Sequence, residues 1–267
     1  MTTTTARPAA LLAAHRRLRA ARASGTPCAP VRDLLDDVGS AYAVQSAWVA
    51  ERLGAGAMVT GRKIGLTSPV VQAQLGVDSP DFGVLLDEMA VPAGGAADTT
   101  RLLQPRIEAE VAFVLGADLD LAAPTGADVA AATDSVTAAL EIVDSRIAGW
   151  DISLLDTVAD NASAGMYVLG PAPRPLGPGL DLAGCAMTMR RNGTAVSTGL
   201  GSACLGSPVR AVAWLAATAY ALGAPLRAGD VVLSGALGPM AAVHPGDQFE
   251  AEIDVLGTVS VTFGSTT

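Results

Sequence analysis

The chain has 267 residues, half of them apolar, and a formal net charge of −9 at pH 7. A chain of this length and composition can bury a sizeable core, so we expect a globular protein. The acidic balance argues against a nucleic-acid partner, because no broad basic surface is available to neutralise phosphates. No uncharged apolar run approaches the ~20 residues that span a bilayer, and we expect no membrane association.

Cysteine and histidine usage limits the possible chemistry. Cys28, Cys185 and Cys204 lie far apart and form no CxxC pair, which is typical of a reducing compartment, so we expect a cytoplasmic protein. Only two histidines are present, His15 and His244. A histidine-rich metal site or a Ser-His-Asp triad is therefore not expected, and carboxylates would have to hold any metal ion.

The first 57 residues are predicted to form a helical N-terminal region. No acidic residue precedes Asp33, a pattern shared by organelle targeting peptides and by a basic amphipathic first helix. Over residues 40–54, Tyr42, Val44 and Trp48 are spaced for one buried helical face, and Gly54 ends the segment.

From residue 58 to residue 267 the pattern changes to that of a β-rich domain. Short apolar runs between Gly, Pro and Asp turns predict strands over 58–66, 106–115, 140–147, 165–170, 185–196, 229–237 and 247–263. The pair Asn192-Gly193 predicts a hairpin, and residues 128–140 and 207–223 have helical patterns. We therefore expect an α+β fold in one continuous structural unit.

Two glutamates in the stretch RIEAEVAFVL are candidate metal ligands. Glu108 and Glu110 stand two residues apart on a predicted strand, so both side chains lie on one face with Cα atoms ~6.5–7 Å apart. Two buried carboxylates repel each other, so either the pKa of one of them is raised or a cation binds to them. Mg²⁺ or Mn²⁺ would be a suitable cation. The alternative to a metal site is a strand with one solvent-exposed face. Arg106 should share that face and form a supporting ion pair.

A second Glu-Ala-Glu serves as an internal comparison. Glu250 and Glu252 are followed by Asp254, which continues the alternation of a half-exposed strand, whereas after Glu110 the sequence is apolar on both faces. Only the first pair is therefore expected to be buried. Glu141, where a predicted helix gives way to a strand, is either a third metal ligand or a helix-end carboxylate. Three convergent carboxylates would leave positions on a metal open for substrate and water.

Several long motifs resemble those of the 2-keto-4-pentenoate hydratases (2-hydroxypenta-2,4-dienoate hydratases), within the fumarylacetoacetate hydrolase superfamily. These motifs are GRKIGLTSPVVQAQLGVDSPDFGVLLDEM, LLQPRIEAEVAFVL, ALEIVDSRI, DTVADNASAGMYVLG and GDVVLSGALGPM. The resemblance covers residue 28 to the C-terminus. It implies a mixed, rolled β-sheet domain of the fumarylacetoacetase C-terminal-like type, a homo-oligomer, and Mg²⁺ or Mn²⁺ held by Glu108, Glu110 and Glu141.

The resemblance also implies a reaction and further site residues. Water would add to 2-hydroxypenta-2,4-dienoate to give 4-hydroxy-2-oxopentanoate, in the meta-cleavage catabolism of aromatic compounds. Lys63 and Asp81 are the candidate proton shuttle, and the ADNAS segment with Ser163 belongs to the substrate pocket. Thr67 and Ser68 could also donate hydrogen bonds to a bound carboxylate.

Lys63 and Asp81 each have an ordinary structural interpretation as well. Lys63 is the only lysine beside sixteen arginines; a strand lysine is usually a solvated surface charge, but a desolvated lysine can lose its proton whereas an arginine cannot. Asp81 could cap a turn. The alternative functions are a 4-oxalocrotonate decarboxylase, an acylpyruvate hydrolase, or a non-catalytic scaffold subunit, for which an acidic cluster would have no use.

Overall fold

The computed structural model describes residues 8–68, 72, 77 and 79–264. Part of the motif that begins at Gly61 therefore lies outside the described residues. The longer helices are α1 (Pro8–Ser24), α2 (Val38–Gly54), α4 (Gly126–Ala132), α5 (Leu154–Ala159) and α6 (Pro208–Ala221). Asp37 caps α2 by accepting a hydrogen bond from the Ser40 amide, and Val44 and Trp48 lie on the buried face of that helix as expected.

Two sheets make up the rest of the fold. The larger has the order β2-β1-β10-β5-β6-β7-β3, with β11 paired to β5, and the smaller has the order β4-β13-β12-β8-β9. The strands are β1 (Val59–Gly65), β2 (Asp81–Leu86), β3 (Ala90–Val91), β4 (Ala96–Ala97), β5 (Pro105–Leu115), β6 (Thr133–Asp144), β7 (Ala164–Leu169), β8 (Ala186–Arg191), β9 (Thr194–Leu200), β10 (Val231–Ala236), β11 (Ala241–Ala242), β12 (Gln248–Ile253) and β13 (Gly257–Phe263).

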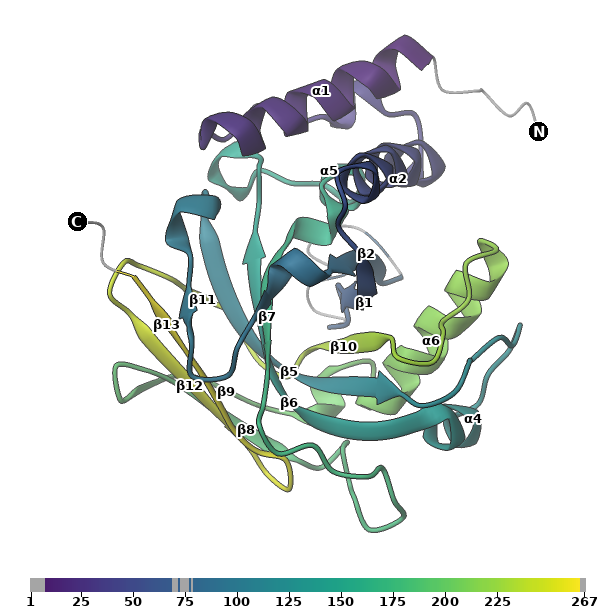
Figure 1. Ribbon diagram of the computed structural model, residues 1–267, viewed down its shortest axis with the longest axis vertical. Coiled ribbons are helices and arrows are strands. Elements are labelled where there is room, and N and C mark those ends of the chain that lie inside the picture. The colour runs from purple at the N-terminus through teal and green to yellow at the C-terminus, as the bar shows by residue number, and fades with distance from the viewer. Residues whose placement is uncertain (1–7, 69–71, 73–76, 78, 265–267) are drawn as a thin grey trace.

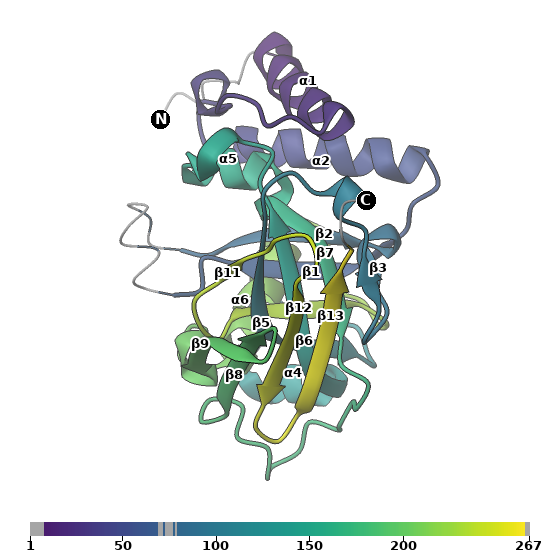
Figure 2. The ribbon, with the colours of Figure 1, turned by 90° about the vertical axis from the view of Figure 1, so that its left-hand side faces the viewer.

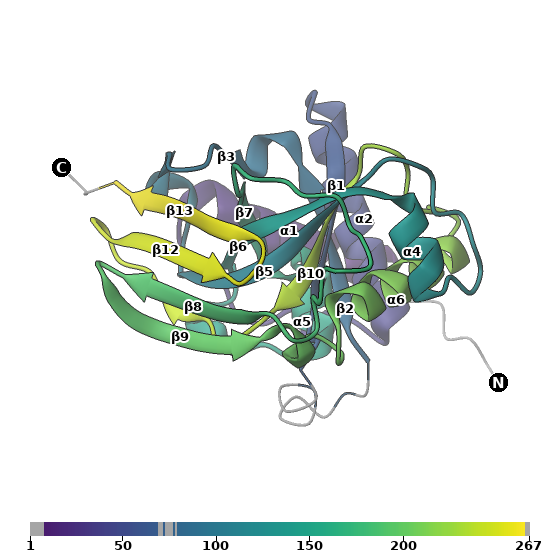
Figure 3. The same cartoon turned by 90° about the horizontal axis from the view of Figure 1, so that it is seen from below.

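The arrangement is a curled mixed sheet with helices at one end. Strand β1 runs parallel to β10, whereas β5 and β6 are antiparallel to their neighbours. Helices α1, α2 and α5 lie together above the larger sheet (Figures 1 and 2), and the smaller sheet lies beside the long β5–β6 pair (Figure 3). The expected α+β class with a mixed, rolled sheet is confirmed. The division at residues 57 and 58 stays a prediction.

The predicted helix over residues 128–140 is wrong beyond its first turns. Helix α4 ends at Ala132, and strand β6 begins at Thr133. The segment carries the β-branched residues Val136 and Thr137, and it pairs along its whole length with β5. Cross-strand pairing in the core therefore outweighs the local helical pattern. The hairpin at Asn192-Gly193 is confirmed: both residues have positive φ, 51° and 82°, between β8 and β9.

Successive side chains of β5 and β6 point to opposite faces of the larger sheet, so one face contributes to the hydrophobic core and the other carries the candidate site residues. Ile107, Ala109 and Val111 pack into the main hydrophobic cluster together with residues of the smaller sheet. Their neighbours Glu108 and Glu110 consequently lie on the opposite face of the larger sheet. Among the described residues, no helix is long and apolar enough to cross a membrane.

Candidate metal centre and active site

Three glutamates from two paired strands converge in the interior. Glu108 on β5 stands directly opposite Glu141 on β6, and Glu110 is two residues further along β5. One carboxylate oxygen from each lies within 4.8 Å of the other two, and all three residues are buried. Glu141 lies inside strand β6, so the helix-end alternative is wrong. By contrast, Glu250 and Glu252 are exposed on β12.

The three carboxyl groups are poorly compensated by protein hydrogen bonds. The amide of Gly235 donates to Glu110 Oε2 over 2.7 Å, but Glu110 Oε1 and both oxygens of Glu141 accept no hydrogen bond from the described residues. Burial, and next the charge of Glu141, raises the pKa of Glu108 to about 7. Burial, followed by charge repulsion from Glu141 and Glu108, raises the pKa of Glu110 well above its usual range, and burial also raises that of Glu141.

This donor set fits a hard divalent cation. Carboxylate oxygens are the ligands that Mg²⁺, Mn²⁺ and Ca²⁺ prefer. Glu110 Oε1 and Glu141 Oε2 have neither a hydrogen bond nor an ion pair with the described residues, and one oxygen from each of the three glutamates lies within 4.8 Å of the other two. Buried charged oxygens without partners cost several kcal/mol each as an order of magnitude, and a cation removes that cost. The acidic cluster could therefore bind a divalent metal ion.

Lys63 lies beside this cluster and is not a surface residue. Its side chain is 4% exposed, and Nζ is 3.1 Å from Glu141 Oε1. The same Nζ donates to the Ala162 carbonyl oxygen over 2.9 Å. Burial alone would lower the pKa of Lys63, but the charges of Glu141 and Asp81, with smaller contributions from the glutamate pair, outweigh burial and raise it. The neighbouring carboxylates therefore favour the ammonium form of Lys63, and its part in proton transfer stays a prediction.

Asp81 is the first residue of β2, paired with Gly65 of β1, rather than a turn cap. It is 1% exposed, and neither carboxylate oxygen accepts a hydrogen bond of regular geometry from the described residues. Burial raises the pKa of Asp81, although the charge of Lys63 opposes the rise. A Cβ on Gly65 would lie 2.2 Å from Asp81 Oδ1 and 3.5 Å from Lys63 Nζ. A larger residue at position 65 would therefore displace the Asp81 carboxylate from its present position.

A small pocket of about 110 Å³ opens onto these residues. Thr67, Ser68 and Ser163 line it, as do Lys63, Asp81 and Glu108. Ser163 is 4% exposed, and its Oγ has no partner among the described residues, so this hydroxyl is available to a ligand. The remaining wall is largely apolar and includes Val143, Trp150, Ile152 and Met240. A larger pocket of about 440 Å³ lies elsewhere, around Arg22, Arg52 and Arg101, away from the glutamates.

Arg106 does not form the ion pair expected for it. No carboxylate of the described residues lies within ion-pair distance. Its guanidinium instead lies over the ring of Trp150, with Cζ 4.4 Å from the ring centroid, and Nη1 is 3.7 Å from Met240 Sδ. Arg106 therefore supports the outer wall of the pocket through Trp150 and Met240.

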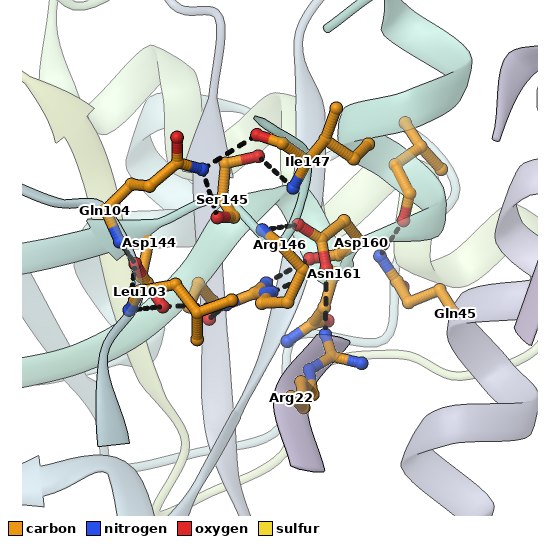
Figure 4. A network of polar contacts seen from close by, with 12 residues as sticks. Arg22, Gln45, Leu103, Gln104, Asp144, Ser145, Arg146, Ile147, Asp160 and Asn161 are labelled. Atoms are coloured by element: carbon orange, nitrogen blue, oxygen red, sulfur yellow. Dashed lines mark hydrogen bonds and ion pairs between the residues drawn. The ribbon is translucent and has the colours of Figure 1, made fainter. Parts of the chain in front are cut away.

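Sequence reasoning missed a buried polar network that surrounds the ADNAS segment (Figure 4). Asp160 accepts hydrogen bonds from the backbone amide and the Nε of Arg146, over 2.8 and 2.6 Å, and from Arg22 over 3.1 Å. Asn161 exchanges two hydrogen bonds with the backbone of Val84 in β2. The charged residues of the sequences DSR (residues 144–146) and ADN (residues 159–161) could have indicated this network, but only the fold shows that these two segments are in contact.

The three residues after Asp160 have an uncommon backbone conformation. Asn161, Ala162 and Ser163 have φ values of 58°, 50° and 55°. Asparagine tolerates this left-handed region, whereas alanine and serine each lose about 1–2 kcal/mol there. The surrounding contacts must supply that free energy.

Comparison with known proteins defines the family. Residues 72–263 match the family model described as fumarylacetoacetate (FAA) hydrolase C-terminal. The chain therefore belongs to the fumarylacetoacetate hydrolase family. Within it, the chain is 54% identical over 255 residues to a 2-keto-4-pentenoate hydratase of Paraburkholderia xenovorans, with 94% of each chain covered. These matches confirm the resemblance found in the motifs.

Two further similar proteins are named for related activities. A 2-hydroxyhexa-2,4-dienoate hydratase of Comamonas testosteroni is 45% identical, with 92% of this chain and 95% of the relative covered. The solved structure of 4-oxalocrotonate decarboxylase from Pseudomonas putida G7, complexed with magnesium and adipate, has a TM-score of 0.92 at 32% identity. That match covers 97% of this chain and 99% of the decarboxylase. The decarboxylase is also known in a complex with calcium and acetate.

Proposed function

We propose that this protein is a divalent-metal-dependent hydratase that adds water to 2-hydroxypenta-2,4-dienoate and forms 4-hydroxy-2-oxopentanoate. The observation that carries this proposal is the buried Glu108–Glu110–Glu141 cluster beside Lys63, with Glu108 lining a small pocket. The relatives named as 2-keto-4-pentenoate hydratases at about half identity support the same reaction. A scaffold subunit would have no use for three converging buried carboxylates.

Glu108, Glu110 and Glu141 are proposed to hold Mg²⁺ or Mn²⁺. The ion would supply positive charge that stabilises an enolate-like oxygen next to the substrate carboxylate. Thr67, Ser68 and Ser163 line the same pocket and are the proposed hydrogen-bond donors to the substrate.

Lys63 and Asp81 are proposed to move the protons of the reaction. From the 2-hydroxydienoate to the product, C5 and C3 each gain a proton, while the C2 hydroxyl and the water that attacks C4 each lose one. The reaction therefore requires both a proton donor and a proton acceptor near the substrate. Lys63 is held as an ammonium group, which suits a donor. Burial raises the pKa of Asp81, and neither of its oxygens accepts a hydrogen bond of regular geometry from the described residues, which suits a proton acceptor.

The pocket wall favours a substrate with a single carboxylate. Lys63 is the only cationic residue among its described lining residues, and Val143, Trp150, Ile152 and Met240 are not charged. A second carboxylate at the far end, as in 4-oxalocrotonate, would be desolvated there without a paired cation. For this reason we rank hydratase activity above decarboxylase activity. A cytoplasmic homo-oligomer is proposed as well.

A direct comparison of two substrates tests the assignment. Purified protein with Mg²⁺ would be offered 2-hydroxypenta-2,4-dienoate or 4-oxalocrotonate, with loss of dienoate absorbance and release of CO₂ followed in each. We expect hydration of the first and little CO₂ from the second. Preferential release of CO₂ from 4-oxalocrotonate would instead identify a decarboxylase.

A further inference from the structure

The turn Asn161–Ser163 contributes two groups to the proposed active site. The Ala162 carbonyl accepts the hydrogen bond of Lys63 Nζ over 2.9 Å, and Ser163 presents an unpaired Oγ to the pocket. Both contacts depend on the left-handed backbone at Asn161, Ala162 and Ser163. If this turn relaxed toward ordinary dihedral angles, the Ala162 carbonyl and the Ser163 side chain would change direction together.

Contacts on both sides hold the turn in this conformation. On one side Asp160 receives three hydrogen bonds from Arg146 and Arg22, and Arg146 Nη1 also donates to the Ala164 carbonyl over 3.1 Å (Figure 4). The residues that flank the turn are therefore fixed by one arginine. Arg146 is 4% exposed, so this clamp is shielded from competing water.

On the other side the turn packs against strand β2. Asn161 Oδ1 accepts from the Val84 amide over 2.8 Å, and Asn161 Nδ2 donates to the Val84 carbonyl over 2.9 Å. A Cβ on Gly83 would lie 2.4 Å from the Asn161 carbonyl oxygen, so only glycine allows this approach. Gly83 is also the residue of β2 that stands opposite Lys63 of β1. The turn therefore lies over the strand pair that carries Lys63.

We propose that the Asn161–Ser163 turn is a positioning element, kept in a strained conformation by Asp160, Arg146 and Asn161, which holds the ammonium group of Lys63 and the hydroxyl of Ser163 toward the substrate. The inference rests on the proposed function of Lys63 and Ser163. It assigns to Asp160, Arg146 and Asn161 a role that acts through the turn and without contact with substrate.

The variant Ala162→Gly separates positioning from ordinary structural support. Glycine relieves the strain at φ 50° and leaves every polar side chain in place, but it lets the turn leave the left-handed region. We expect thermal stability at or above that of the wild type, together with a kcat about tenfold or more below it. The metal concentration at half-maximal activity should not change, because the turn supplies no carboxylate.

Val255→Gly is the matched control. Val255 has a φ of 63° in the turn between β12 and β13, away from the pocket, so glycine relieves strain of the same kind there. We expect stability at or above the wild-type value and unchanged kcat. A kcat for Ala162→Gly within about twofold of the wild type would overturn the inference, as would a clear loss of stability, which would show that the turn is not strained. Absence of hydration by the wild type would instead overturn the proposed function.

Discussion

Stability should depend jointly on pH and on divalent metal because the metal ligands are buried. The pKa of Glu108 rises from 4.5 to about 7 in the folded chain. A folded pKa above the unfolded one means that the native state binds more protons, so metal-free stability falls as pH rises. For Glu108 this loss is about 3 kcal/mol, absent below pH 4.5 and complete above pH 7.

Metal binding requires the deprotonated carboxylates, so it should offset this loss chiefly at high pH. Thermal unfolding would be followed at pH 5.5 and pH 8, with excess Mg²⁺ or with EDTA. About 2 kcal/mol of the loss falls between these two pH values. We therefore expect the metal-induced rise in Tm to be larger at pH 8 by roughly 4 °C or more, since about 1 kcal/mol corresponds to about 2 °C for a domain of this size.

Two single-site variants provide the comparison. Glu108→Gln removes one of the three carboxylate ligands and should abolish most of the metal-induced rise in Tm at pH 8. Glu250→Gln alters the exposed glutamate of the second Glu-Ala-Glu and should behave as the wild type. An equal rise in Tm at both pH values, or an unchanged metal effect in Glu108→Gln, would refute the assignment of the metal centre.

Three further substitutions test individual contacts. Lys63→Arg should lower kcat by about 100-fold with Tm nearly unchanged, because a guanidinium cannot reproduce both contacts of Nζ; near-normal turnover would remove Lys63 from the mechanism. Gly65→Ala places a Cβ 2.2 Å from Asp81 Oδ1 and should lower kcat about tenfold, whereas Gly177→Ala, with open space around it, should not. Arg106→Gln should cost only about 0.5–1 kcal/mol in a urea titration, since the residue loses a stacking contact and no ion pair; a loss of several kcal/mol would reveal a missing partner.

The metal ligands could be predicted from sequence because strand alternation is a local property. Glu108 and Glu110 share a face by their spacing alone, and the apolar continuation after Glu110 indicated burial. The convergence of Glu141 needed more, since its register against Glu108 is set by pairing between β5 and β6. The same pairing explains the error at residues 133–140, where a locally helical pattern became a strand.

The supporting residues could not be predicted, because their roles depend on long-range contacts. Asp160 meets Arg22 of α1 across 138 positions of sequence, and no periodicity marks that contact. The left-handed backbone of Ala162 and Ser163 contradicts the usual preference of these residues, so local propensity predicts the wrong conformation. Arg106 was placed on the correct face, but its contact with Trp150 depends on a loop with irregular dihedral angles.

Reconstitution of activity with metal tests the central claim most directly. Protein treated with EDTA and then freed of chelator would be mixed with 2-hydroxypenta-2,4-dienoate, and formation of 4-hydroxy-2-oxopentanoate would be measured before and after addition of Mg²⁺ or Mn²⁺. We predict no product without metal and recovery of hydration with it, in wild type but not in Glu141→Gln. Hydration at the same rate in the presence of EDTA would contradict the account.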